Sequence, residues 1–245
     1  GGPRAGVMKG RGNVAGANTA ELVEMLGHAN GWHRDTAQRL LYERQDKSAV
    51  PMLKKVLDGE NALAKLHALG ALQGLESLKL EQVLALLKDP EPRVRERALV
   101  ICGRFLELGA DNDTILNAAA ELWDEQDERV RFQLALLASR LNSSRVLEIG
   151  GGVLREGLGN LVGALSNIDE PSPWIIGALL SGRGDAFGAL YGWMTFRKSP
   201  DEVVNHPGFS DCLQYMGRGG AKEWLPQTLE VIAKCSSPNK WIKQL

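Results

Sequence analysis

The sequence has few cysteines, and none is placed for metal or haem binding. Cys102, Cys212 and Cys235 are scattered over 245 residues. They form neither a CxxC nor a CxxCH motif, and an odd, widely spaced set does not make a disulfide framework. Cys102 falls on the apolar side of an expected helix, so its expected role is packing in the core. We therefore expect no zinc knuckle and no covalently attached haem.

The chain also lacks long apolar runs and an excess of charge of one sign. Its best apolar stretch, 174–180, is far shorter than the roughly 20 residues of a transmembrane helix. Residues 1–17 contain Arg4, Lys9 and Arg11 but no apolar core, so no signal peptide is visible. The formal net charge is -1, with 24% charged and 44% hydrophobic residues. This composition is typical of a soluble globular protein and argues against a nucleic-acid groove, which needs a concentrated basic surface.

Residue types that carry catalysis are present, but not in a catalytic pattern. The histidines His28, His33, His67 and His206 show no i, i+3 or i+4 spacing, which favours structural or surface roles over metal binding. The glycine run 150–152 follows no expected strand and belongs to no phosphate-loop motif. No nucleophile occupies a strand-to-helix elbow. We therefore expect no catalytic residue, no cofactor and no metal site, and hence no enzyme.

What the sequence does contain is one pattern repeated four times, with a basic residue three positions before a small or apolar residue. The basic residues are Arg34, Lys65, Arg95 and Arg131, and the small or apolar residues are Ala37, Ala68, Ala98 and Leu134. A fifth segment, 174–178, fits without the charge. The offsets, continued to Ala178, are 31, 30, 36 and 44 residues. A helical pattern with this period indicates a stack of helix pairs.

Capping and turn residues divide the chain into expected helices. Asn18 with Glu21 resembles a capping box, and the run 89–92 (DPEP) stops one helix and starts the next. One expected helix begins after Asn18, another runs from the 89–92 turn through 105, and an imperfect or kinked one covers 152–166. The other expected helices are 32–43, 49–57, 63–72, 80–87, 114–123, 128–141, 174–180, 185–196, 209–216 and 224–233. The segment 200–207 is expected to be irregular. No segment alternates with period 2. The predicted fold is all-α, a HEAT-like α-solenoid of about five to six helix pairs.

The predicted domain organisation is a Gly-rich linker over 1–17 followed by one repeat domain over 18–245. The repeats are expected to be regular over 18–181 and less regular over 182–245. Small residues let neighbouring helices approach closely, so the four alanines of the pattern should be buried where inner helices cross. These are Ala37, Ala68, Ala98 and Ala178.

The candidate partner-binding residues are Trp32 and the four basic residues Arg34, Lys65, Arg95 and Arg131. Equivalent positions of a repeat stack align, so the basic side chains should form a ladder. They either pair with acidic turn residues and lock neighbouring repeats, which is the favoured alternative, or form a docking strip for an acidic partner. The acidic turn residues that could serve are Asp58, Asp89, Glu91, Asp124 and Asp127. For Arg95 and Arg131 we expect an acidic turn residue or a carbonyl within about 4 Å.

The tryptophans are the main large aromatic residues: Trp32, Trp123, Trp174, Trp193, Trp224 and Trp241. Trp32 and Trp174 lie at the starts of inner helices, where we expect a tryptophan to staple one helix to the next. An exposed tryptophan would instead be the first candidate for a partner contact.

The segment 30–41 (NGWHRDTAQRLL), together with 46–51, 66–69, 89–96 and 173–175, resembles the HEAT-repeat region of a bacterial family. In that family a sugar-dehydrogenase-like β-propeller precedes the repeats and a c-type cytochrome domain often follows them. The resemblance implies a periplasmic or exported redox protein in which the repeats connect an oxidising domain to an electron acceptor. Because this sequence has no CxxCH and no propeller strands, no haem ligand and no catalytic residue is carried over.

The predicted function is therefore a non-catalytic scaffold for protein–protein or inter-domain contacts, as part of a larger redox protein. The alternative is a HEAT-like enzyme, such as a DNA glycosylase or a bilin lyase, because fold alone does not decide function. A DNA enzyme should carry a basic concave face with exposed aromatics and a carboxylate. A lyase should carry a reactive pair in a pocket, for which Cys102, His33 and His67 are the residues to inspect.

Overall fold

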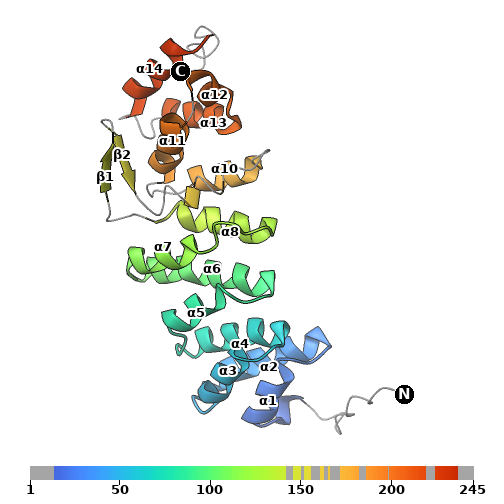
Figure 1. Cartoon of the computed structure of the whole chain (residues 1–245). Coiled ribbons are helices and arrows are strands. Elements are labelled where there is room, and N and C mark those ends of the chain that lie inside the picture. Colours follow the sequence, from blue (N-terminus) through green and yellow to red (C-terminus); the bar gives the residue numbers. More distant parts are fainter. Residues whose placement is uncertain are drawn as a thin grey trace. The chain divides into compact units, whose positions relative to one another are not determined.

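The computed structural model describes residues 14–141, 146–149, 152–155, 161–162, 165, 172–181, 186–197, 199–218 and 224–236, and these are mostly helical (Figure 1). Contacts divide the chain into two compact units, Gly1–Gln82 and Val83–Leu245. The sequence predicted a single domain over 18–245, with a change of regularity at 181. The division after Gln82 is therefore a feature that periodicity did not indicate.

The first unit contains two helix pairs. Its elements are the 3-10 turn η1 (Val14–Gly16), α1 (Thr19–Met25), α2 (Gly31–Arg44), α3 (Ala49–Leu57) and α4 (Ala62–Gly74). Helix α1 packs on α2, α3 packs on α4, and α2 packs on α4, so the second helices of the two pairs lie together. The predicted capping box of Asn18 and Glu21 begins α1.

The start of the first unit lies earlier than the sequence indicated. Val14 and Ala17 are buried, although they belong to the segment predicted as linker. Arg44 holds this segment, because its guanidinium donates to the carbonyl oxygens of Ala15 at 2.8 Å and Ala17 at 2.6 Å. Residues 14–17 therefore belong to the folded unit rather than to a linker, and the part of the predicted linker over 1–13 lies outside the described residues.

The second unit opens with the same kind of helix pairs. Helix α5 (Leu80–Leu86) spans the unit boundary and is followed by α6 (Pro92–Glu107), α7 (Asn112–Ala120), α8 (Glu128–Ala138) and α10 (Pro173–Leu180). Helix α8 packs on α6 and on α10, and α7 packs on α6 (Figure 1). Proline at the first position of α6 and of α10 suits a helix start, because that position has no intrahelical N–H bond to lose.

A β-hairpin replaces part of a predicted helix. Strands β1 (Val146–Ile149) and β2 (Gly152–Arg155) pair antiparallel, with Ile149 opposite Gly152. Two glycines separate these partners in the sequence, a composition that favours two-residue hairpin turns. The predicted helix over 152–166 is therefore wrong at its beginning, whereas residues 161–162 and 165 are helical. The glycine run 150–152 is compatible both with an imperfect helix, as predicted, and with the turn of a hairpin.

The last four described helices are α11 (Ala186–Arg197), α12 (Pro200–Asn205), α13 (Pro207–Gly217) and α14 (Leu225–Lys234). Helix α10 contacts α11 and α13, and α12 contacts α13 and α14. The segment 200–207 was predicted to be irregular, but Ser199 and Glu202 form a capping box and Pro200 occupies the first turn of α12. Here Pro200 and Pro207 each begin a helix rather than interrupt one.

The buried core confirms the register of the repeats. Ala37, Ala68 and Ala98 are fully buried, and Ala178 retains 4% exposure. Together with the stacked pairs, this places the chain in the α-solenoid class of helical-repeat folds that the sequence predicted, apart from the hairpin. Among the described residues, no helix combines the length and the apolar character needed to cross a bilayer.

Candidate protein-interaction surface

The second helices of four pairs begin in the same way. Their N-cap residues are Asn30, Asn61, Glu91 and Asp127, and each side chain accepts a backbone N–H of the first turn. The caps are 31, 30 and 36 residues apart, and the basic residue always comes four positions after its cap. Sequence analysis identified the basic residues but missed these caps, although their residue types are those that favour N-cap positions.

Arg34 joins the first turn of α2 to the loop before it and to α4. Its Nη1 donates to the carbonyl oxygens of His28 at 2.6 Å and Ala29 at 2.9 Å. Its Nε donates to Nε2 of His67, on α4, at 3.2 Å. We call this arrangement, an arginine that holds its own loop and the next repeat, a brace.

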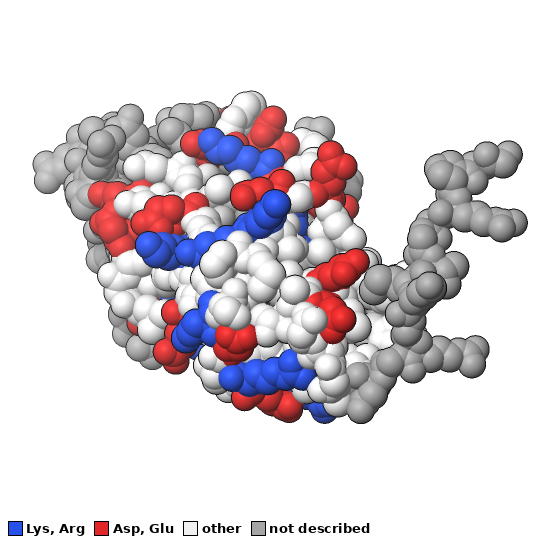
Figure 2. Space-filling view, turned by 90° about the horizontal axis from the view of Figure 1, so that it is seen from below, with Lys and Arg blue, Asp and Glu red and all other residues white. Residues whose placement is uncertain are grey.

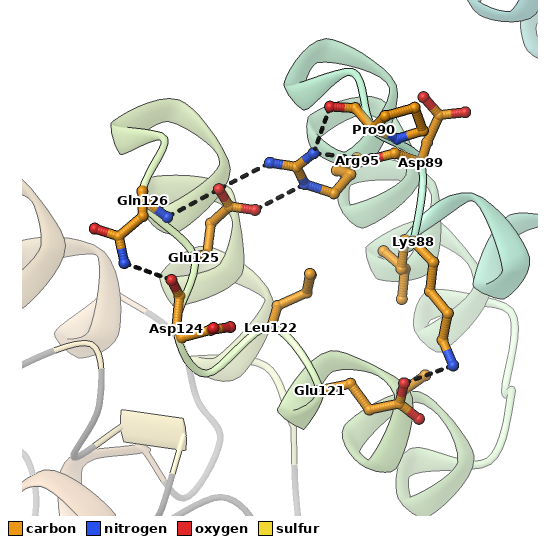
Figure 3. A pocket seen from close by; sticks show the side chains of 11 residues that line it. Lys88, Asp89, Pro90, Arg95, Glu121, Leu122, Asp124, Glu125 and Gln126 are labelled. Atoms are coloured by element: carbon orange, nitrogen blue, oxygen red, sulfur yellow. Dashed lines mark hydrogen bonds and ion pairs between the residues drawn. The ribbon is translucent and has the colours of Figure 1, made fainter. Parts of the chain in front are cut away.

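Arg95 forms a second brace of the same design (Figure 3). Its Nη1 donates to the carbonyl oxygens of Asp89 at 2.8 Å and Pro90 at 3.1 Å. Its Nε and Nη2 form two bonds with the carboxylate of Glu125, at 2.7 and 2.9 Å. The acceptor in the next repeat is thus a carboxylate from a loop rather than an imidazole from a helix.

Glu125 is held as an anion although it is buried. Its side chain is 6% exposed and that of Arg95 15%. Burial acts to raise the pKa of Glu125, but the bonds from Arg95 and from the backbone amides of Asp127 and Gln126 outweigh it, so the net pKa is lowered. The bonds to Glu125 in turn raise the pKa of Arg95. The brace therefore remains charged at neutral pH.

Arg131 and Lys65, the other two basic residues of the ladder, are also held within the fold. Nη2 of Arg131 donates to the carbonyl oxygen of Leu165 at 3.0 Å. Burial is the main cause that lowers the pKa of Arg131. Lys65 occupies the equivalent position of α4 and is buried. The predicted bonding of Arg95 and Arg131 to acidic turn residues or carbonyls is thus confirmed, although Glu125 was not among the partners we had considered.

A pocket of about 500 Å³ lies between the loops before α6 and α8 (Figure 3). Leu87 and Leu122 contribute apolar surface, and Lys88 and Glu121 form an ion pair of 2.6 Å at its edge. Because Arg95 is bound to Glu125, the basic side chains that line the pocket are paired. A volume of about 500 Å³ is large enough for a side chain or a small group.

Charge on the surface is mixed. On the face shown in Figure 2, Lys and Arg side chains lie beside Asp and Glu side chains. One such contact in the first unit is the pair of Arg39 and Glu43 on α2, at 3.5 Å. Mixed charge of this kind suits contacts with proteins better than a contact with the phosphates of nucleic acid.

Three tryptophans are exposed, contrary to the expectation that those at inner-helix starts staple helices together. Trp32 is 61% exposed, Trp123 65% and Trp174 78%. Trp224 does pack inward, with its ring 5.5 Å from that of Tyr191. Trp241 lies outside the described residues, as does the side chain of Trp193.

Trp32 differs from the other two exposed tryptophans in its ring contacts. Its ring stands edge-on to that of His33, with centroids 5.1 Å apart, and His33 stands edge-on to His28 at 4.3 Å. No ring contact is recorded for Trp123 or Trp174 within the described residues. The Trp32 ring is therefore exposed and at the same time in contact with the ring of His33.

The histidines and cysteines form no recognisable reactive site in the described part of the chain. No group of three or more His, Cys, Asp or Glu residues there could hold a metal ion. Cys102 is buried, which raises the pKa of its thiol to about 12. His67 is occupied by Arg34 and by Gln38, whose Oε1 lies 2.7 Å from its Nδ1. Sequence reasoning had named these residues as those to inspect for a lyase.

Comparisons with known proteins do not place the chain in a family. No family model matches the chain, and no curated protein matches it. Among solved structures, the chain is similar to a designed armadillo repeat protein in complex with the peptide (KR)4. The identity is 16%, the TM-score is 0.41, and the match covers 89% of this chain and 99% of that chain. The resemblance to the bacterial redox family thus remains a prediction from the sequence.

Proposed function

We propose that this protein is a non-catalytic helical-repeat scaffold that binds a protein partner at the start of α2, with Trp32 as the anchor. The observation that carries the proposal is an aromatic side chain that is 61% exposed and yet supported by the ring of His33. Tryptophan is enriched among residues that dominate binding energy, because it buries a large area and loses few rotatable bonds.

The basic ladder has a supporting part in this proposal. Arg34 fixes the loop before α2 and thereby the turn that presents Trp32, while Arg95 and Arg131 hold other repeats together. Lys65 occupies the equivalent position next to the first brace. In this proposal the four basic residues stabilise the fold and do not form a docking strip for an acidic partner.

The identity of the partner is a further part of the proposal. The resemblance of segment 30–41 to the redox family supports a partner domain that is a dehydrogenase or a c-type cytochrome, in an exported protein. The mixed surface charge is compatible with such a partner and gives no support to a DNA glycosylase.

The test is to place a photoactivatable phenylalanine at position 32 of the full chain, identify the protein to which it crosslinks in its native host, and measure binding of the purified pair by calorimetry. Trp32→Ala should weaken binding at least about 30-fold, which corresponds to about 2 kcal/mol. Trp123→Ala is the matched control, because this side chain is equally exposed but lies in the other unit. Equal affinity of Trp32→Ala and the unchanged chain, both folded, would refute the proposed surface. Turnover of damaged DNA or of a bilin by the isolated chain would refute the non-catalytic role.

A further inference from the structure

Three of the four histidines, His28, His33 and His67, belong to one series of contacts that begins at Trp32. His33 contacts the Trp32 ring, and His28 contacts His33. The carbonyl oxygen of His28 accepts a bond from Arg34, and Arg34 donates to His67. These contacts connect the exposed Trp32 with the half-buried His67 of α4.

The bond between Arg34 and His67 requires a neutral imidazole. Arginine can only donate, so Nε2 of His67 must accept, and the ring proton must sit on Nδ1. Oε1 of Gln38 lies 2.7 Å from this Nδ1 and accepts a hydrogen bond from its N–H. A second proton on His67 would have to occupy Nε2, where it would point at the guanidinium and place two cations 3.2 Å apart.

The charges around His67 are few. From α2, Arg34 and Asp35 act on it, and α3, which also packs on α4, adds no charge that acts on its pKa. Burial is the largest cause and lowers the pKa of His67; Asp35 raises it and Arg34 lowers it, so the net pKa lies below the ordinary 6.5. The imidazole is therefore neutral at pH 7.5 and gains a proton only as the pH falls below 6.5.

We propose that the brace of Arg34 and His67 is a pH-dependent switch that positions Trp32 near neutral pH and releases it in mildly acidic solution. This inference rests on the proposed function, because it makes binding through Trp32 dependent on pH. The second brace provides the contrast, since Glu125 stays ionised over the same range and keeps Arg95 in place.

The direction of the effect follows from the proton balance. As pH falls below 6.5, the unfolded chain binds a proton at His67 before the folded chain does. The contribution of the brace to stability is thus complete above pH 6.5 and declines as pH falls toward the lowered pKa of the folded state. Below that pKa the imidazolium repels Arg34, and the guanidinium that holds the loop carrying His28 loses its bond to α4.

The experiment labels the full chain with 5-fluorotryptophan and follows the fluorine resonance of Trp32, assigned with Trp32→Phe, from pH 7.5 to 5.0. We expect this resonance to titrate with a midpoint below 6.5, and the same component to be lost in His67→Gln, which can still accept from Arg34 but does not titrate. The resonance of Trp123, assigned with Trp123→Phe, should not follow this titration. A Trp32 titration that is unchanged in His67→Gln would overturn the proposal.

A second measurement does not depend on the variant. Long-range proton–nitrogen spectra of the unchanged chain should show the Nδ1–H form of His67 at pH 7.5 and protonation below pH 6.5. An Nε2–H form, or a midpoint at or above 6.5, would overturn the switch. Neither readout needs a partner, so a titrating Trp32 in a chain whose Trp32→Ala variant still binds its partner would refute the proposed function and leave the switch standing.

Discussion

Removal of the Glu125 carboxylate tests whether the braces hold the repeats together. Glu125 accepts two bonds from Arg95 and one from each backbone amide of Gln126 and Asp127. Glu125→Ala deletes all four bonds. It leaves a guanidinium that is 15% exposed with only the carbonyl oxygens of its own loop as partners.

The expected cost is about 3 kcal/mol. Hydrogen bonds to charged groups contribute about 1.5–3 kcal/mol, and breaking a buried pair from one side costs about 3–5 kcal/mol. Because Arg95 keeps two carbonyl partners and some contact with solvent, the lower end of the second range applies. For a domain of this size, such a loss lowers the melting temperature of the second unit by roughly 6–12 °C.

The assay is thermal denaturation followed by circular dichroism, with Glu121→Ala as the matched control. Glu121 pairs with Lys88 on the same pocket, but the two side chains are 58% and 69% exposed. An exposed pair of this kind contributes about 0–1 kcal/mol. Equal shifts for Glu125→Ala and Glu121→Ala would refute the brace. A double-mutant cycle with Arg95→Ala should give a coupling energy above about 1 kcal/mol.

Four further predictions concern the core, a helix cap, a buried thiol and the ionisation of Glu125. Ala98→Trp should overpack the fully buried crossing of α6 and cost at least about 1–3 kcal/mol in urea denaturation, and an unchanged midpoint would contradict the repeat register. Asp127→Ala should cost about 1–2 kcal/mol, because its side chain caps two amides of α8; Asp127→Asn should recover most of it. Cys102, whose pKa burial raises to about 12, should react with Ellman's reagent at pH 8 only after urea is added, and rapid labelling in the native chain would show that this helix opens. Glu125→Gln should remove the part of the stability that is present above pH 4.5 in the unchanged chain and is lost as pH falls through the lowered pKa of Glu125.

The regular helix pairs could be predicted because their signals are local. A proline at a helix start and a small residue at a crossing act within a few positions, so the start of α6 and the burial of Ala68 and Ala98 followed from the sequence. Pro200 shows the limit of such rules, since proline starts a helix as readily as it ends one. The hairpin was missed because Gly-Gly suits both a broken helix and a two-residue turn, and tertiary contacts decide between them.

The site could be predicted only in part, because it depends on contacts across repeats. The position of Arg95 followed from periodicity, but its partner did not, since Asp89, Asp124 and Asp127 are equally acidic in the sequence. Only the fold shows that Glu125 faces the guanidinium. Exposure of Trp32 had no sequence signal either, because the same residue at a helix start can point toward or away from its neighbour.

The spacing of the repeats explains why the two braces use different acceptors. The loop between α3 and α4 is residues 58–61, whereas the loop between α7 and α8 is residues 121–127, and this difference accompanies the longer interval of 36 residues between the caps Glu91 and Asp127. The longer loop brings a carboxylate back toward Arg95 and forms one wall of the pocket. The shorter loop also contains carboxylates, those of Asp58 and Glu60, but the Nε of Arg34 donates instead to His67 on α4. A neutral histidine at this position of α4 accepts the bond from Arg34 and lies within hydrogen-bond distance of Gln38. Because the reference pKa of histidine, about 6.5, is higher than that of a carboxylate, the histidine brace becomes sensitive to pH at higher pH than the Glu125 brace does.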